Sequence, residues 1–224
     1  MPSLTVENYV KAIFNISEGG QRPAATGQVA AALNVSPGTV TSMLKTLNES
    51  GLANYAPYEG ARLTESGCTL ALRILRRHRL IESFLTKSLD LDWDQVHNDA
   101  EQLEHVMSDF LLERIDENLG HPRFDPHGDP IPTADGTLAT LDARPLADCE
   151  KGDQFRLARV VDQSPEFLRF LKRSGLSLGV RGQVVDKLAE AGTVTIQANG
   201  QQTTLGRDAA TNLLVTQPEE NGRH

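Results

Sequence analysis

Cysteine and long apolar runs are scarce in this 224-residue chain, and their scarcity excludes several protein classes. Cys68 and Cys149 are the only cysteines, and neither has a second Cys or His nearby at zinc-finger spacing. A disulfide scaffold or a thiolate zinc site is therefore excluded. No segment approaches the roughly 18 apolar residues of a membrane helix, and the chain does not begin with a basic region followed by an apolar stretch. Because 39% of its residues are hydrophobic, we expect a folded cytoplasmic protein.

The net charge of −8 is concentrated in the middle of the chain. Residues 1–63 carry four basic and four acidic side chains, residues 64–119 carry six and twelve, and residues 120–224 carry twelve and fourteen. A neutral first segment leaves nucleic-acid binding open despite the acidic total. Carboxylates that face one another in the middle segment need a cation to offset their repulsion, and a metal ion is the obvious candidate.

The first segment has the pattern of a helix-turn-helix followed by a β-wing. A helix of regular apolar spacing stops at a glycine pair, Thr26 is expected to cap a short second helix, and Ser36 with Pro37 starts a third. Two short strands, at 52–55 and 61–63, enclose a tight turn. Two short helices joined by a turn, with hydroxyl side chains outward on the second, are typical of DNA binding.

The remainder predicts an α+β protein of three domains. We expect a winged helix-turn-helix domain at 1–64, a helical domain with a Pro/Gly-rich linker at 65–142 and a small β-barrel at 143–217. A helix starting near Asp92 is expected to bury the stripe Val96, Leu103, Val106, Met107, Phe110 and Leu111. The expected barrel elements are strands Gln154–Val161, Gly179–Lys187, Thr193–Ala198 and Gln201–Leu205, with a helix at Pro165–Arg173.

Histidine and glutamate cluster on the predicted helices of the middle segment. Four side chains fall within an arc of about 100° on one helical face: His97, Glu101, Glu104 and His105. His78 and Glu82 stand at i and i+4 on the preceding helix. Carboxylates clustered in this way are unfavourable without a cation. Imidazole and carboxylate without thiolate suit Mn²⁺ or Fe²⁺ better than a structural zinc site.

Two alternatives to a metal sensor follow from the same residues. Catalytic di-iron bundles need Glu-x-x-His on two helices, whereas Glu101 lies four residues before His105. A metal-dependent enzyme or storage bundle is therefore disfavoured. A DNA-binding regulator that senses a small molecule instead of metal stays open, and in such a protein Glu104 would not matter for DNA binding.

The chain resembles the diphtheria toxin repressor family of metal-dependent transcriptional regulators over nearly its whole length. The segments that carry the resemblance are the helix-turn-helix through Gly51, Arg77–Glu82, Val96–Ser108 and Pro126–Pro132. The resemblance implies a homodimeric repressor with an N-terminal winged helix, a helical metal-binding and dimerisation domain and a C-terminal Src-homology-3-like barrel. Double-stranded operator DNA is the implied partner, with no membrane and no small-molecule substrate.

About two metal sites per subunit are implied by this resemblance. The ancillary site falls on His78, Glu82 and His97, completed from the barrel by Gln163 and Glu166. The primary, activating site falls on Asn8, Glu101, Glu104 and His105, and Asn8 departs from the Met or Asp usual in the family. Two-domain manganese regulators have Glu where this chain has Lys11, so a binuclear site through that position is not expected.

The identity of one ligand favours manganese. Glu101 stands where iron-sensing relatives have Cys and manganese-sensing relatives have Glu, and a hard carboxylate favours Mn²⁺ over softer ions. The expected function is a manganese-dependent repressor of metal-uptake genes, and an Fe²⁺-dependent repressor of the same fold is the alternative. The DNA contacts that the resemblance implies are Ser36, Pro37, Gly38, Thr39 and Ser42, with Lys45 and Arg62 on phosphates.

Overall fold

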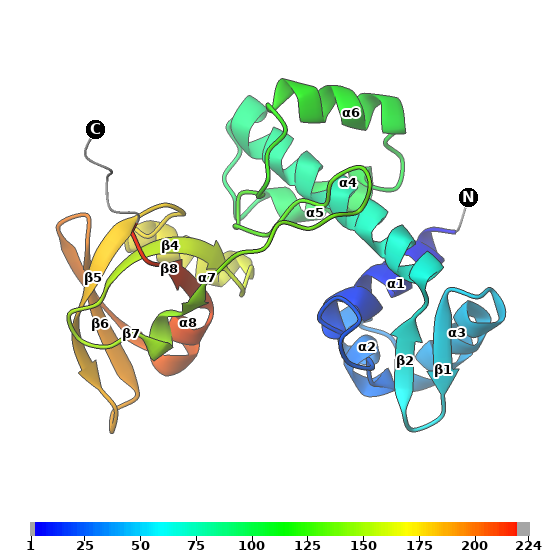
Figure 1. The fold of residues 1–224 in the computed structure, drawn as a ribbon, viewed down its shortest axis with the longest axis horizontal. Helices are drawn as coiled ribbons and strands as arrows, with labels where there is room; N and C mark the ends of the chain where they lie inside the picture. Colours follow the sequence, from blue (N-terminus) through cyan, green and yellow to red (C-terminus); the bar gives the residue numbers. More distant parts are fainter. Residues whose placement is uncertain (1–2, 219–224) are drawn as a thin grey trace. The chain divides into compact units, whose positions relative to one another are not determined.

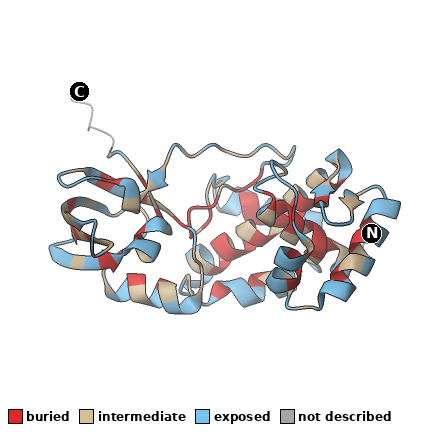
Figure 2. Cartoon of the chain, turned by 90° about the horizontal axis from the view of Figure 1, so that it is seen from below, coloured by how far each residue is buried: buried red, intermediate tan, exposed pale blue. Residues whose placement is uncertain are grey.

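The computed structural model describes residues 3–218 (Figure 1). These residues form two compact units. The first unit comprises the residues up to His78, Glu101–Leu112 and Pro132–Leu138, and the second comprises Arg79–Ala100, Glu113–Ile131 and the residues from Ala139 onward. No helix within the described range is long and apolar enough to cross a membrane. Buried residues gather on the inward sides of the helices, and the outward sides are exposed (Figure 2).

The first unit begins with a winged helix. Its elements are α1 (Leu4–Ile16), α2 (Thr26–Leu33), α3 (Pro37–Glu49) and the antiparallel hairpin of β1 (Ala53–Ala56) and β2 (Gly60–Leu63). The side chains of Val10, Ile13 and Leu44 are fully buried in its core. Because one face of each helix packs against this core, its apolar residues recur at helical spacing.

The N-cap predicted for α3 is confirmed, whereas the N-cap predicted for α2 is wrong. Ser36 is the N-cap of α3 and accepts a hydrogen bond from the Thr39 N–H, with Pro37 as the first helical residue, as predicted. The prediction that Thr26 caps α2 is wrong, because the N-cap is Ala25. The Gln28 side chain accepts a hydrogen bond from the Ala25 N–H at 3.1 Å, which satisfies this backbone donor without a capping hydroxyl.

The helices that follow are α4 (Glu65–Leu89), α5 (Val96–Leu103) and α6 (Asp109–Asn118). The expectation of one continuous helix through this region is wrong. The chain turns after Leu103, whose carbonyl accepts hydrogen bonds from the next turn, and the Ser108 hydroxyl then accepts from the Leu111 N–H at 3.2 Å at the start of α6. Glu104 and His105 therefore lie in the turn rather than on a helix.

The apolar stripe predicted on that helix is only partly buried. Val96 is fully buried, as expected. By contrast, Val106 and Phe110 are each 77% exposed, and Leu103 and Leu111 are also exposed. The periodicity is real, but no element among residues 3–218 covers these four side chains.

The second unit contains a six-stranded sheet with the strand order β3-β8-β4-β5-β6-β7. Its elements are β3 (Arg144–Pro145), η1 (Leu146–Asp148), β4 (Gln154–Val160), α7 (Pro165–Arg173), β5 (Arg181–Leu188), β6 (Thr193–Ala198), β7 (Gln201–Gly206), α8 (Arg207–Thr211) and β8 (Leu213–Thr216). The four predicted strands and the helix are present, with boundaries shifted by at most two residues. The sequence analysis missed β3, α8 and β8, which are too short to show a periodic pattern.

A test of the packing between α4 and the wing follows from Gly67. A Cβ at this position would lie 2.0 Å from the Leu52 carbonyl oxygen, whereas a Cβ at Gly27 in α2 meets nothing within 4 Å. Alanine is favoured over glycine in a helix by up to about 1 kcal/mol, so Gly27→Ala should raise the free energy of unfolding. Gly67→Ala should lower it by about 1–3 kcal/mol because of the overlap. Denaturant unfolding measures both, and a Gly67→Ala protein as stable as wild type would contradict the packing.

Candidate metal centre

The first candidate cluster lies within the first unit and combines side chains from three parts of the chain. Glu7 and Asn8 come from α1, His78 comes from α4, and Glu101, Glu104 and His105 come from the end of α5 and the turn after it. The Glu104 side chain is fully buried and Glu7 is 9% exposed. The cluster therefore gathers carboxylates where water screens their charges poorly.

Hydrogen bonds link the imidazoles to the carboxylates of this cluster. His78 Nδ1 donates to Glu104 Oε2 at 2.6 Å, and His105 Nε2 lies 3.3 Å from Glu104 Oε1. His105 Nδ1 donates to Glu7 Oε2 at 2.7 Å. Glu7 was not among the predicted ligands. It stands next to Asn8 and brings a second oxygen donor of α1 to the cluster.

A lysine also enters this cluster. Lys11 Nζ donates to Glu101 Oε1 at 2.5 Å and to Glu104 Oε1 at 2.7 Å. The sequence analysis treated Lys11 only as a position where a ligand is missing. In the structure it contributes a positive charge at the same carboxylates that the resemblance assigns to the primary metal site.

Asn8 provides a test of whether the cluster fits a metal ion. Its Oδ1 is shielded from solvent and accepts no hydrogen bond from the described residues. A buried amide oxygen without a donor is unfavourable, and a cation would satisfy it. Together with the carboxylates and imidazoles of the cluster, Asn8 gives a candidate set of oxygen and nitrogen donors only, which suits Mn²⁺ or Fe²⁺.

A second candidate cluster lies within the second unit. Glu82, Asp125 and His127 are all buried, and each offers one ligand atom within 4.8 Å of the others. His127 Nε2 donates a hydrogen bond to the Trp93 carbonyl at 2.9 Å. In the neutral ring the lone pair is therefore on Nδ1. This Nδ1 atom lies 3.6 Å from Glu82 Oε2. His97, which is half exposed, approaches Glu82 Oε1 at 3.3 Å. The pairing of Glu82 with His97 agrees with the sequence analysis.

The electrostatics of the second cluster are those of carboxylates crowded out of water. Burial, together with the neighbouring Asp129 and Glu82 carboxylates, raises the pKa of Asp125 from 3.8 to about 7. Burial alone disfavours the imidazolium of His127, but the nearby Glu82 and Asp125 carboxylates outweigh this effect and raise the pKa of His127. A cation that relieved these repulsions would be favoured here.

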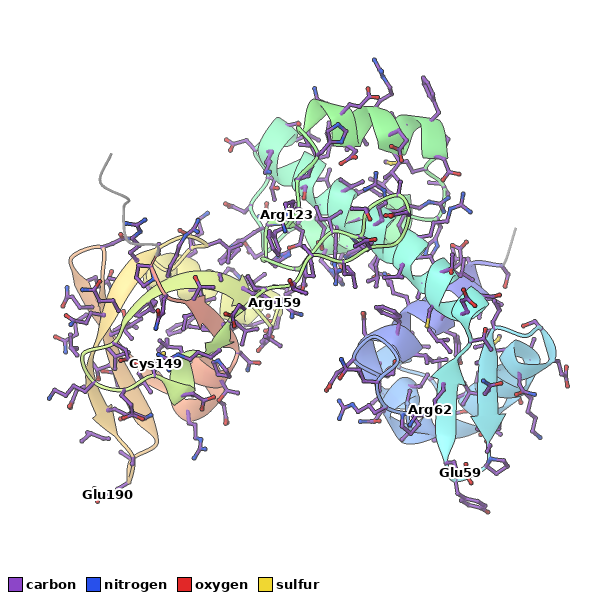
Figure 3. All side chains as sticks on the ribbon, viewed as in Figure 1. Glu59, Arg62, Arg123, Cys149, Arg159 and Glu190 are labelled. Atoms are coloured by element: carbon purple, nitrogen blue, oxygen red, sulfur yellow. The ribbon has the colours of Figure 1, made fainter. Side chains whose placement is uncertain are left out.

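The loop that carries Asp125 and His127 is fixed by backbone packing. Gly128 has φ of +88°, and a Cβ there would lie 2.1 Å from the Ala158 carbonyl oxygen, so only glycine fits. Arg159, which extends from β4 (Figure 3), places Nη2 2.6 Å from Asp129 Oδ1. Gln163 Nε2 donates to Asp129 Oδ2 at 2.6 Å. Gln163 thus reaches this region through Asp129.

Two residues of the predicted ancillary site have other partners in the structure. His78, which the resemblance assigned to that site, also bonds the buried Glu104 carboxylate of the first cluster. Glu166 is 81% exposed on α7 and pairs with Arg169 at 3.2 Å, so it is not gathered with Glu82. Asp125 and His127 were missed as ligands. The density of Asp and His in the otherwise Pro/Gly-rich segment 125–129 was the available signal.

The predicted DNA-contacting residues form an exposed face of the winged helix. Ser36, Pro37, Gly38, Thr39, Ser42 and Lys45 are all exposed along α3. Arg62 is exposed on β2, and its Nη1 donates to the Gln21 carbonyl at 3.3 Å. Figure 3 shows Arg62 on this strand and Glu59 at the turn of the wing. The face is small and polar, with little charge.

Comparison with known families covers almost the whole chain. Residues 1–61 match the iron dependent repressor, N-terminal DNA binding domain, and residues 64–133 match the iron dependent repressor, metal binding and dimerisation domain. Residues 144–217 match the FeoA domain. These matches confirm the predicted fold class, an α+β chain with a winged helix, a helical domain and a Src-homology-3-like domain.

Individual relatives agree with these matches. A diphtheria toxin repressor of Corynebacterium glutamicum is 30% identical, over 96% of this chain and 97% of its own. The iron-dependent repressor IdeR of Mycobacterium tuberculosis is 31% identical, over 85% of this chain and 80% of its own. A solved manganese-dependent transcriptional repressor, in complex with manganese, is 39% identical with a TM-score of 0.88, over 95% of this chain and 100% of its own. The chain therefore belongs to the iron-dependent repressor family that includes the diphtheria toxin repressor, and it is a metal-dependent transcriptional repressor rather than an enzyme.

Proposed function

We propose that this repressor is activated by Mn²⁺ and controls metal-uptake genes as a cytoplasmic homodimer on operator DNA. The observation that carries the proposal is the first cluster, because it joins α1 of the winged helix to the end of α5 through candidate ligands. An ion held there fixes α1 against the dimerisation helices. If only that arrangement fits the operator, metal and DNA strengthen each other's binding.

The ligand set supports manganese. The ion would be held by Asn8, Glu101, Glu104 and His105, with Glu7 and His78 bonded to these ligands or joining them. Every donor is an oxygen or an imidazole nitrogen, which suits Mn²⁺ better than a soft thiolate site does. The similar solved manganese-dependent repressor, in complex with manganese, supports the same choice.

A second ion is proposed at the cluster of the second unit. Glu82, Asp125 and His127 form its buried part, His97 completes it at the exposed side, and Gln163 supports it through Asp129. We leave Glu166 out of this set because it is paired with Arg169 at the surface. This gives two sites per subunit, the number that the resemblance implied.

The homodimer is supported by the exposed apolar stripe of the first unit. Leu103, Val106, Phe110 and Leu111 lie at the end of α5 and the start of α6, with Val106 and Phe110 each 77% exposed. Large apolar side chains gathered on a surface mark an interaction site. In the proposed dimer these residues pack against the same residues of a second copy, and each copy presents its α3 face to one operator half-site.

The role of the first cluster is tested by Glu104→Gln. This change removes the buried charge that would bind the ion, so Mn²⁺ should no longer tighten operator binding, whereas in wild type we expect an increase of about 5- to 150-fold. Fluorescence anisotropy with a duplex selected from a random pool measures this at fixed salt. Glu117→Gln, at an exposed Arg114 pair, is the matched control. Equal Mn²⁺ dependence in both variants would contradict the proposal.

The choice of metal is tested by Glu101→Cys. Under anaerobic conditions, operator binding by wild type should respond to Mn²⁺ at a lower concentration than operator binding by Glu101→Cys. The variant should respond more readily to Fe²⁺ and Zn²⁺, because thiolate is the softer ligand. Operator binding titrated with each metal separates the manganese sensor from the iron sensor. A wild type that responds to Fe²⁺ before Mn²⁺ would favour the iron alternative, and no response to any metal would favour the small-molecule sensor.

The repulsion between the buried carboxylates of the second cluster is tested by Asp125→Asn in metal-free protein. Folded Asp125 keeps its proton up to a pKa of about 7, whereas the unfolded carboxyl releases it near 3.8. Wild type therefore loses stability as pH rises from about 4 to 7, because the Asp125 carboxyl is harder to ionise in the folded protein. The Asp125→Asn variant has no proton to release here and does not lose this stability. The stability advantage of the variant over wild type should grow from pH 5 to 7 and then level off.

Thermal unfolding with a chelator between pH 5 and 8 measures this difference. Asp135→Asn is the control, because hydrogen bonds from the Thr133 hydroxyl and the Thr137 backbone hold the pKa of Asp135 below its usual value. Its difference from wild type should not change over this pH range. A flat difference for Asp125→Asn as well would show that Asp125 is ionised throughout.

A further inference from the structure

The first cluster already contains a cation that the chain itself supplies. Lys11 lies on α1 one turn after Glu7 and Asn8, and its side chain is only 11% exposed. Its Nζ is 2.5 Å from Oε1 of Glu101, and 2.7 and 3.0 Å from the two oxygens of Glu104. These oxygens provide acceptors for the three ammonium protons.

The ammonium contacts the oxygens that an entering metal ion needs. A divalent ion bound to both Glu101 and Glu104 would stand beside Nζ, and like charges at short range repel strongly where water is largely absent. Lys11 has a long flexible side chain, so its ammonium can withdraw from the carboxylates without unfolding α1. Metal and lysine therefore compete for the same two carboxylates.

We propose that Lys11 is an internal competitor of the activating metal and sets the metal concentration at which the repressor is loaded. In the metal-free protein its ammonium offsets the charge of Glu104 and ties α1 to the end of α5. When an ion enters, that tie passes from Lys11 to Asn8 on the same helix. The inference rests on the proposed function, since it takes the first cluster as the activating site.

Removal of the lysine charge then has two effects of opposite sign. Metal binding strengthens, because the ion no longer has to displace an ammonium. The metal-free protein weakens, because buried Glu104 keeps only the imidazoles of His78 and His105 among its described contacts. If Lys11 has only a structural role, removal of its charge lowers the stability of the metal-free protein, and metal affinity falls or stays the same.

The experiment compares full-length wild type with Lys11→Met. Mn²⁺ affinity is measured by calorimetry and by the electron paramagnetic resonance signal of free Mn²⁺, and melting is measured with a chelator. If the ammonium occupies the carboxylates more than about nine-tenths of the time, Lys11→Met should bind Mn²⁺ at least about tenfold more tightly. Its metal-free melting temperature should be lower than that of wild type. Lys11→Gln, which is polar and uncharged, replaces Lys11→Met if that variant does not fold.

Two controls make the result specific to the charge at this position. Lys11→Arg keeps a cation and should bind Mn²⁺ no more tightly than wild type. Lys151→Met removes a lysine that is 69% exposed and paired with Asp186, and should change neither Mn²⁺ affinity nor the effect of metal on melting. The gain in Lys11→Met should also disappear when Glu104→Gln is added.

The possible failures are distinguishable. If wild type binds Mn²⁺ through Glu104 but Lys11→Met binds it no more tightly, the competitor role is overturned and the proposed function stands. If Glu104→Gln leaves Mn²⁺ binding intact with either residue at position 11, the activating site itself is wrong and the competitor role falls with it.

Discussion

The negative charge of the buried Glu104 side chain constrains the arrangement of the first unit. A carboxylate removed from water is stable only if charges and donors surround it. His78 on α4 and Lys11 on α1 supply them at 2.6 and 2.7 Å, and His105 Nε2, in the turn after α5, lies 3.3 Å away. One charge thus connects the first helix of the winged helix with two helices that follow it in sequence. Because the same carboxylate is a candidate metal ligand, whatever changes its counter-charge acts on the DNA-binding domain.

Both clusters balance their carboxylates with basic side chains of the chain itself. Lys11 contacts the first cluster, and Arg159 lies 2.6 Å from Asp129, next to the second. This internal compensation offsets part of the charge that a metal ion would otherwise have to neutralise. It is incomplete, since the Asn8 amide oxygen has no donor among the described residues and the pKa of Asp125 is raised to about 7. The remaining imbalance is what a divalent ion would correct.

Much of the fold, but less of the site, was predictable from the sequence. The caps and periodicity that predicted the winged helix are local, and so are the alternating strands of the barrel. The grouping of His97 with His105 on one helical face failed because the helix ends at Leu103, although Ser108 was a visible N-cap for the next helix. The roles of His78 and His127 depend on contacts between residues far apart in sequence. No periodicity encodes them, and only the three-dimensional fold shows which carboxylate each imidazole meets.

The weak charge of the predicted DNA-contacting face is consistent with the metal control proposed through α1. Residues 1–63 have no net charge, and the exposed face of α3 contains a single basic residue, Lys45, with Arg62 on the wing. A winged helix with so few cations gains little from phosphate contacts alone, so we expect isolated copies to bind DNA weakly. Affinity then has to come from two copies whose α3 helices match successive half-sites at once, which requires each winged helix to be held in a fixed position. In the proposed function, the metal-dependent tie between α1 and α5 provides that restraint where charge does not.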